Sequence, residues 1–394
     1  MKKRKAGCPG KAKYLAGKRI LPESISAKTS IVQLIDNMDA YNGGRLRAAC
    51  HLLRDRYSKQ DVTVGLSLAG ALTPAGLGPS AIIPLMNHGF VDWMTATGAN
   101  MYHDLHFAFN LPMHRGSHLV DDIDLRDKGV TRIYDILFDY EDVLMETDRR
   151  LRKILLQPEF QKEMGTREFY YHLGKVMDEY EKKNKLGEVS IVAAAYRNGI
   201  PVFTSSPGDS TIGMNVAGLE LLAQSTGLQD KFKLKINPSI DVNDSTGIIL
   251  NAKRYEKGKT GVILIGGGSP KNFMLQTEPQ IQEVLMIPEV GQDYDINITD
   301  ARPDTGGLSG APPGEAASWG KIDPTKLDET VTAYVDVTVA VPLMVAYVRQ
   351  TTKPKKLKRL YHRGAELHKK LVASYLENNK EVGQLTKLMK KLPE

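Results

Sequence analysis

Short apolar runs that end in small residues alternate with helix-like stretches along most of this chain. The clearest are residues 62–68, followed by a Gly- and Pro-rich segment at 69–78, and residues 260–265, followed by three glycines at 266–268. Apolar runs of this length between turn-forming residues predict buried strands. At least six such units imply an α/β fold that is Rossmann-like, with a mostly parallel sheet covered by helices on both faces. Sheets of this kind bind ligands where their strands end.

The composition is that of a soluble globular protein. The 394 residues are 41% hydrophobic and 25% charged, which is typical of such domains. The sequence has no apolar run near the ~20 residues of a membrane-spanning helix, and the basic start at 1–5 lacks the apolar block of a signal peptide. Cys8 and Cys50 are too few for a disulfide framework. We therefore expect a cytoplasmic protein with no membrane partner.

Positive charge gathers at the two ends of the chain. The formal net charge is +7, and much of it lies in the first 20 residues and in the tail from Lys353. No recognition-helix, zinc-finger or ribonucleoprotein motif accompanies it, so we expect solvated surface and no nucleic-acid partner. Residues 1–30 are predicted to form a basic arm. Residues 351–394 are predicted to form a basic helical extension, because leucines recur there at helical spacing.

The stretch 309–321 holds the residues best suited to chemistry. Its first half is kept irregular by Ser-Gly and Pro-Pro-Gly, and residues 315–318 have room for one short helical turn. Trp319 stands close to Lys321. An apolar wall lowers the pKa of a lysine, and a neutral lysine amine attacks imines and carbonyls. A solvated surface lysine is the alternative on composition alone.

Histidines are densest between residues 103 and 118. His103 and His106 are three residues apart and would share a face of a helix, which makes a metal site conceivable. The spacing fits no specific metal motif, and no His-Glu-x-x-His pattern is present. We therefore expect no metal.

Two further features each allow a structural and a functional interpretation. The glycines 266–268 would let the backbone turn sharply or approach a nucleotide. Asp336 lies within the apolar segment 332–341, where a carboxylate needs donors. Ribose hydroxyls would supply them, and so would the amides at the start of a following helix. The residues alone leave both choices open.

Several of these segments together resemble one known family. Residues 309–311, 315–316 and 318–321 closely resemble the active-site segment of deoxyhypusine synthases, in which the lysine of Ser-Trp-Gly-Lys carries a covalent imine. The glycines 266–268 look like the family's triple-glycine turn, and residues 334–336 look like the end of its closing strand. The resemblance covers roughly residues 30 to 350.

The resemblance implies a specific reaction. NAD takes a hydride from the carbon beside the secondary amine of a polyamine such as spermidine, and Lys321 then holds the aminobutyl group. The acceptor is a lysine of a translation factor in deoxyhypusine synthases, and putrescine in the related homospermidine synthases. Trp319 would shield the carrier lysine, and Glu315 would hold a cationic end of the polyamine. Residues 31–350 would form an NAD-binding catalytic domain, and four subunits would form a homotetramer.

The resemblance also assigns residues to the cofactor. By their positions in the family's motifs, these are Thr97, Gly98, Asp209, Gly267, Gly268, Ser309 and Asp336.

The chain departs from the family's pattern at four positions. Met214 and Leu308 stand where the family has acids, and Asn272 stands where it has a histidine. His103 aligns with a further acid, and we expect His103, Asp104 and Asn272 to compensate in the catalytic site. The changes predict a narrower, drier pocket for a shorter or less charged amine than spermidine. They also leave open a non-catalytic NAD-binding homologue or a regulatory subunit.

Overall fold

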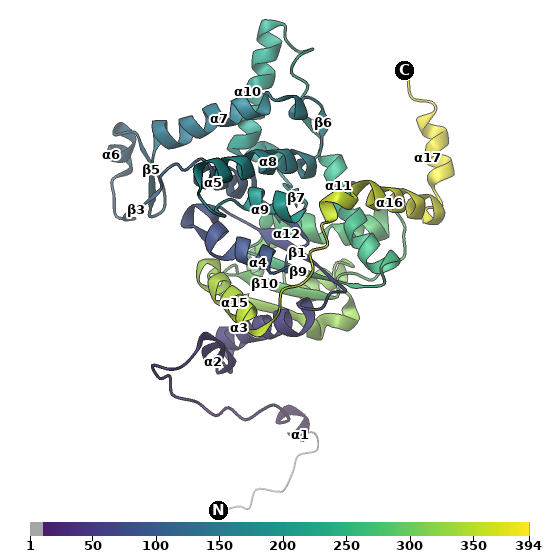
Figure 1. The fold of residues 1–394 in the computed structure, drawn as a ribbon. Coiled ribbons are helices and arrows are strands. Elements are labelled where there is room, and N and C mark those ends of the chain that lie inside the picture. The colour runs from purple at the N-terminus through teal and green to yellow at the C-terminus, as the bar shows by residue number, and fades with distance from the viewer. Residues whose placement is uncertain (1–10, 394) are drawn as a thin grey trace, which may run out of the picture.

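A computed structural model describes residues 11–393 of the chain. Its centre is a parallel sheet (Figure 1), whose six strands follow the order β11-β10-β9-β1-β2-β7. The strands are β1 (Val62–Leu68), β2 (Trp93–Ala96), β7 (Val202–Phe203), β9 (Lys259–Ile265), β10 (Tyr294–Thr299) and β11 (Thr330–Tyr334). Helices cover both faces of this sheet, so the α/β, Rossmann-like class is confirmed.

The helices connect the strands or extend the two ends of the chain. They are α1 (Lys11–Tyr14), α2 (Ile31–Asp36), α3 (Tyr41–Leu52), α4 (Ile83–Asn87), α5 (Gly98–Ala108), α6 (Asp122–Asp127), α7 (Glu146–Leu155), α8 (Thr166–Asn184), α9 (Ile191–Asn198), α10 (Thr211–Thr226), α11 (Pro238–Leu250), α12 (Gly268–Leu275), α13 (Thr277–Pro279), α14 (Pro313–Ser318), α15 (Val337–Thr351), α16 (Gly364–Asn378) and α17 (Val382–Met389). A π-helical turn, Gln280–Val284, continues α13. None of the helices in the described part of the chain is long and apolar enough to cross a membrane.

The order of the strands reverses next to β1. The chain passes from β1 to β2 and β7 on one side, and it returns to β9, β10 and β11 on the other. All neighbouring strands are parallel, with Leu66 of β1 opposite Ile263 of β9. The carboxyl ends of the strands therefore lie along one edge of the sheet, and the crevice between β1 and β9 is where such a fold binds a ligand.

The two faces of the sheet differ in character. Alternate strand residues, such as Leu66, Ile263 and Ile296, join a buried aliphatic cluster with α3, α4 and α15. The residues between them point to the opposite face, where Trp93 and Val262 pack with α11, α12 and α16. This second face, here called the polar face, also carries buried polar residues of β1 and β10.

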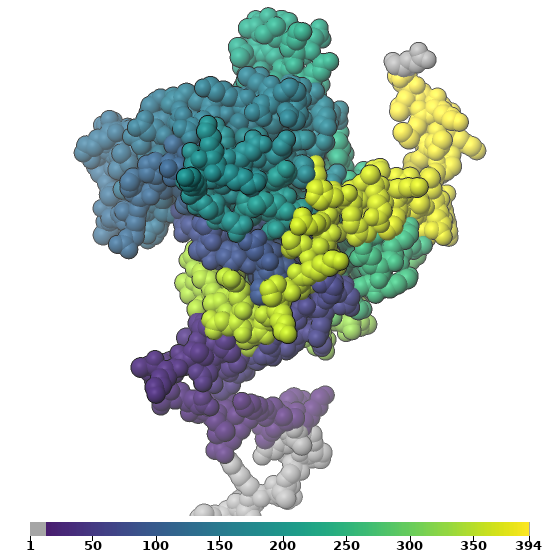
Figure 2. All heavy atoms as spheres, in the orientation of Figure 1, coloured from purple at the N-terminus to yellow at the C-terminus, as the bar shows by residue number. Residues whose placement is uncertain are grey.

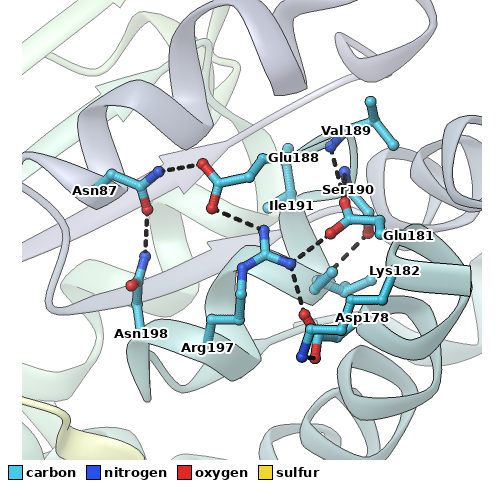
Figure 3. Close-up of polar contacts among 12 residues, drawn as sticks. Asn87, Asp178, Glu181, Lys182, Glu188, Val189, Ser190, Ile191, Arg197 and Asn198 are labelled. Atoms are coloured by element: carbon cyan, nitrogen blue, oxygen red, sulfur yellow. Dashed lines mark hydrogen bonds and ion pairs between the residues drawn. The ribbon is translucent and has the colours of Figure 1, made fainter. Parts of the chain in front are cut away.

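A buried charged network joins α8 to α9 (Figure 3). The Glu181 carboxylate, 3% exposed, accepts the N–H groups of Val189 and Ser190 at 2.8 and 2.7 Å. Arg197 of α9 donates to Glu181 and, at 2.8 Å, to Asp178. Because these buried carboxylates are paired with an arginine and backbone amides, the network holds the two helices together.

Two small sheets accompany the central one within residues 11–393. β3 (His114–Arg115), β5 (Ile136–Asp139) and β4 (Val130–Ile133) form an antiparallel sheet, and β6 (Glu163–Met164) pairs with β8 (Lys235–Ile236). The sequence does not predict them, because strands of two to four residues leave no clear alternation. The strands expected at 62–68 and 260–265 are confirmed as β1 and β9.

The two ends of the described chain extend from the rest of the molecule. Leu367 and Leu371 of α16 are buried against α11, whereas α17 has no buried residue and stands clear of the body (Figures 1 and 2). Residues 13–28 form an exposed arm. The basic start at 1–5 and Cys8 lie outside the described residues. The division into an arm, a catalytic domain and an extension stays a prediction.

Candidate active site

The backbone of Lys321 is held by its neighbours. After α14 and Trp319, Gly320 turns the chain with a φ of 67°, a left-handed conformation that favours glycine. The Lys321 N–H donates to the Ala316 carbonyl at 3.0 Å, and the Lys321 carbonyl accepts the N–H of Gln292 at 3.0 Å. These two hydrogen bonds hold the main chain of Lys321 in place at the mouth of the turn.

The Lys321 amine lies in a half-buried, partly apolar setting. Its Nζ donates to Oδ1 of Asn272 at 3.1 Å and lies 5.9 Å from the centre of the Trp319 ring. Burial lowers the pKa of Lys321, against the opposing effect of the Glu315 and Glu283 carboxylates. A larger fraction of this side chain is therefore the neutral, nucleophilic amine than for a lysine in water.

A pocket of about 300 Å³ surrounds this amine. It is lined by Lys271, Asn272, Leu275, Gln276, Leu308, Ala311, Glu315, Ala316, Trp319 and Lys321. The structure thus brings together four of the candidate catalytic residues. Trp319 is 60% exposed, so its indole forms an outer wall of the pocket and does not by itself shield the amine.

α12 supplies pocket residues that the sequence analysis did not single out. Lys271 and Leu275 lie four residues apart, as do Asn272 and Gln276, so each pair shares a helix face. Once Asn272 is placed on a helix, this four-residue spacing predicts that Gln276 lies beside it. The pocket therefore has a second lysine and a second amide in addition to the expected residues.

Lys271 connects the pocket with polar groups inside the protein. It is 4% exposed, donates from Nζ to the Ala311 carbonyl at 2.8 Å, and has its pKa lowered by burial. Burial raises the pKa of Asp295 to about 7, against the attraction of the Lys271 ammonium. Oδ1 of Asp295 and both amide atoms of Asn297 have no hydrogen-bond partner in the described structure. Unpaired buried polar atoms of this kind lower the stability of a fold.

Candidate cofactor residues follow β2 and β7 at the carboxyl edge of the sheet. Thr97 and Gly98 begin α5, where Oγ1 of Thr97 accepts the N–H of Asn100 at 3.2 Å. Asp209 is exposed in the turn after β7. A Cβ on Gly98 would lie 2.2 Å from Oγ of Ser210, so the loops after the two strands touch at this glycine.

Three further candidates lie in the loops after β9 and β10. A Cβ on Gly267 would lie 2.3 Å from Cα of Ser309, so a glycine is needed for these two loops to pack together. Gly268 has a φ of 64°, and nothing lies within 4 Å of the place where its Cβ would be. The backbone at the start of α12 is therefore open on this side, a feature that phosphate-binding helix starts share.

Asp336 is an exposed helix cap. It follows β11, and its Oδ1 accepts the N–H of Thr338 at 2.8 Å at the start of α15. The burial expected from the apolar segment is not found, because the strand ends at Tyr334 and the chain turns into a helix at Val337. Asp336 still stands at the same edge as the other candidates, so its capping role leaves room for a ligand contact.

His103 does not reach the Lys321 pocket and is not among its lining residues. Nδ1 of His103 lies 3.0 Å from Nε2 of His106, and Nδ1 of His106 lies 2.9 Å from Oγ1 of Thr147. Burial lowers the pKa of His103 to about 4 and that of His106 to about 3, so both rings are neutral at pH 7. The two histidines share a helix face as their spacing predicts, but α5 turns that face toward Phe138.

The two apolar replacements take different places. Leu308 lines the pocket, whereas Met214 is 65% exposed on α10 and is not among the lining residues. Only Leu308 therefore makes this pocket more apolar. Among residues 11–393, no three His, Cys, Asp or Glu side chains are arranged to hold a metal ion.

A family model for deoxyhypusine synthase matches residues 30–348. The chain belongs to the deoxyhypusine synthase family. It is 52% identical over 366 residues to a deoxyhypusine synthase-like protein of Nostoc sp., a match that covers 93% of each chain. A protein of the same name from Thermosynechococcus vestitus is 50% identical, over 95% of this chain and 90% of that one.

More distant relatives carry related names. A protein of Methanosarcina acetivorans named probable deoxyhypusine synthase 2 is 35% identical, over 82% of this chain and 88% of its own length. A crystal structure of a candidate deoxyhypusine synthase from Entamoeba histolytica superposes with a TM-score of 0.52 at 13% identity, covering 86% of this chain and 100% of that one. This last likeness concerns the fold alone. Deoxyhypusine synthases are transferases, which sets the general class of the chain.

Proposed function

We propose that this chain is an NAD-dependent transferase that moves an aminobutyl group from a polyamine to an acceptor amine, with Lys321 as the covalent carrier. The observation that carries the proposal is the setting of Lys321, a half-buried amine with a lowered pKa that donates to Asn272 in a pocket of about 300 Å³. A protein that only binds a nucleotide has no use for such a lysine. This argues against the alternative of a non-catalytic homologue or regulatory subunit.

The pocket suits an aliphatic amine that carries positive charge. Leu275, Ala316 and the Trp319 ring offer apolar surface to methylene groups. The Glu315 carboxylate lies at the same pocket and would hold a cationic end of the polyamine. Oδ1 of Asn272 accepts an N–H of Lys321 at 3.1 Å. This hydrogen bond orients the lone pair of the Lys321 nitrogen relative to the polyamine.

In this proposal Lys321 accepts the aminobutyl group and gives up a proton. Its neutral amine adds to the carbon of a protonated imine of the donor, and a new C–N bond forms. One proton passes from the Lys321 nitrogen to the nitrogen of the departing amine, the old C–N bond breaks, and the departing amine leaves neutral. The aminobutyl group then stays on Lys321 as an imine until the acceptor amine displaces it. Leu308 and Trp319 at the rim limit the access of water to this imine.

The strand ends next to β1 and β9 fit a dinucleotide. The open backbone at Gly268 suits a phosphate, and the exposed carboxylates of Asp209 and Asp336 suit ribose hydroxyls. Thr97 and Ser309 stand on loops that form the walls of this edge. NAD bound there would accept the hydride in the first oxidation and would return it to the last imine, which becomes the new secondary amine.

The pocket also bears on assembly. Leu308 and Trp319, at its rim, are 48% and 60% exposed, and a second subunit laid over them would bury this apolar surface and close the pocket. This supports a pair of subunits, and the resemblance to the family implies that two such pairs form a homotetramer, which light scattering would distinguish from a dimer or a monomer. The acceptor is either a protein lysine, as on a translation factor, or putrescine.

Product analysis tests the proposal. The protein is incubated with NAD and a panel of polyamines that includes spermidine, with and without putrescine, and the products are identified by mass spectrometry. We expect release of a diamine from the donor, and a new polyamine when putrescine is present. Lys321→Ala should give neither, whereas Lys369→Ala, a change at an exposed lysine of α16, should match the wild type. A wild-type protein that binds NAD and converts no member of the panel would favour the non-catalytic alternative.

A further inference from the structure

A second pocket adjoins the one that contains Lys321. It has a volume of about 400 Å³ and lies between α11, α12 and the π-helical turn Gln280–Val284. Asn272 and Gln276 line both pockets, so α12 forms a shared wall between them. Here it is called the Glu283 pocket, after a carboxylate at its exposed rim.

The Glu283 pocket offers acceptors and negative charge. Glu283 is the one charged side chain among the described residues that line it. The hydroxyls of Ser245 and Thr246 donate to the Val242 carbonyl at 3.1 and 2.7 Å, and that of Thr277 donates to the Met274 carbonyl of α12 at 2.8 Å. Since each hydroxyl has a single proton, what remains on these oxygens is acceptor capacity. A ligand that donates hydrogen bonds and carries positive charge matches this lining.

The same pocket also has apolar surface. Val242, Phe273 and Val284 are among its lining residues, and they suit a chain of methylene groups. Together with the acceptors, they describe an aliphatic ammonium compound as the ligand class. A phosphate or a carboxylate would meet like charge at Glu283 and is disfavoured.

The Glu283 pocket is close to the carrier lysine. The Glu283 carboxylate acts to raise the pKa of Lys321, which requires the two groups to lie within reach of a Coulomb interaction. The Nζ of Lys321 donates to Asn272, on the shared wall, at 3.1 Å. An amine bound in the Glu283 pocket therefore lies near a carbon held on Lys321.

We propose that the Glu283 pocket binds the acceptor, and that this acceptor is a small aliphatic diamine. One ammonium of the diamine pairs with Glu283, and the other amine, in its neutral form, attacks the imine carbon on Lys321 beside Asn272. A protein lysine has a single amine, which is the reacting one, and would leave Glu283 without a partner. The diamine is therefore the better match. This inference rests on the proposed role of Lys321 as carrier.

The step is balanced without an oxidant or reductant. The neutral amine of the diamine forms a bond to the carbon of the protonated imine, and one proton then passes from the diamine nitrogen to the Lys321 nitrogen. The bond between the Lys321 nitrogen and the carbon breaks, and Lys321 leaves as a neutral amine. The new imine, again protonated, is between the aminobutyl carbon and the diamine nitrogen.

Calorimetry with two ligands of equal chain length tests the site on the whole protein without NAD. Putrescine carries two ammonium groups, and 1,4-butanediol, which has the same length and no charge, serves as the matched probe. We expect the wild type to bind putrescine more tightly than 1,4-butanediol. Glu283→Gln should weaken putrescine binding roughly fivefold, the effect of losing one partly exposed ion pair, and should leave any binding of 1,4-butanediol unchanged. Glu179→Gln, a change at an exposed carboxylate of α8, should alter neither.

The outcomes separate this inference from the proposed function. Putrescine that binds the wild type and Glu283→Gln equally, or that loses affinity only in Glu315→Gln, would overturn the Glu283 pocket as the diamine site, even if Lys321 forms an imine. A loss specific to Glu283→Gln would support the site even if no imine forms on Lys321. Equal weakening of both ligands in Glu283→Gln would show a general distortion and would also overturn the assignment.

Discussion

The two faces of the central sheet differ in the side chains that they bury. On one face, Leu66, Ile263 and Ile296 are at most 1% exposed and are packed among aliphatic side chains of α3, α4 and α15. On the polar face, Asp295 and Asn297 of the same strand as Ile296 are equally buried, yet polar atoms of both have no partner in the described structure. The pocket of Lys321 lies over this second face, since Leu275 of α12 lines the pocket and also belongs to the cluster buried on that face.

The unpaired polar side chains make the polar face less stabilising than the aliphatic face. A buried unpaired amide or carboxylate costs about 1–3 kcal/mol, and an aliphatic side chain of similar size would avoid this loss. Polar residues kept at such positions are expected where a site needs them. We therefore expect the aliphatic face to respond to substitution as a structural core, and the polar face to gain stability when its polarity is removed.

The largest expected effect is on the aliphatic face. Leu66→Ala removes a fully buried side chain and should lower the free energy of unfolding by about 3 kcal/mol, through lost burial and the cavity left behind. Urea titration followed by circular dichroism measures this change. A loss below about 1 kcal/mol would show that this face is not the tightly packed core described here.

A smaller, pH-dependent effect is expected at Asp295. Its pKa in the folded protein is raised to about 7 from an ordinary value of 3.8, so the folded state binds the proton more tightly than the unfolded state. The contribution of this group to stability therefore falls as the pH rises from about 4 to about 7, and stays low above that.

The Asp295→Asn variant lacks this titration. Between pH 5 and pH 8 its free energy of unfolding, measured relative to the wild type, should rise by roughly 2 kcal/mol. Asp209→Asn, a change at an exposed carboxylate, serves as the control and should follow the wild type. A constant difference between Asp295→Asn and the wild type across this range would contradict the raised pKa.

The smallest effect is expected at Asn297. Both amide atoms of this side chain are buried and unpaired in the described structure, so Asn297→Leu should raise the free energy of unfolding by about 1 kcal/mol. Its neighbour Ile296 points to the other face, and Ile296→Val should lower the same quantity by about 1 kcal/mol. Opposite signs at adjacent residues would support the contrast between the faces. A loss of stability in Asn297→Leu would mean that the amide has a partner in solution.

Much of the fold is predictable from the sequence because its signals are local. The apolar runs at 62–68 and 260–265 are strands, and the residues that follow them lie at one edge because parallel strands end together. The placement of Lys321 near Trp319 and Glu315 is also local, since all three belong to α14 and the residues just after it.

The rest depends on contacts between distant segments. Glu283 acts on Lys321 only because the turn after α13 contacts the active-site segment, where Gln282 donates to the Gly320 carbonyl at 2.8 Å. Asp295 is buried because helices cover its strand on that face. The alternation of residues along β10 does not by itself predict this cover. His103 has a spacing suited to a site, but the direction in which α5 faces decides that it pairs with His106 instead.

The role of Lys321 is tested most directly by trapping the imine. The wild-type protein is incubated with NAD and a labelled polyamine donor, treated with borohydride, digested and analysed by peptide mapping. Borohydride reduces an imine to a stable secondary amine, so we expect the label on Lys321 and none in Lys321→Ala. Label on the other pocket lysine, Lys271, or label that persists in Lys321→Ala, would contradict the central role given to Lys321.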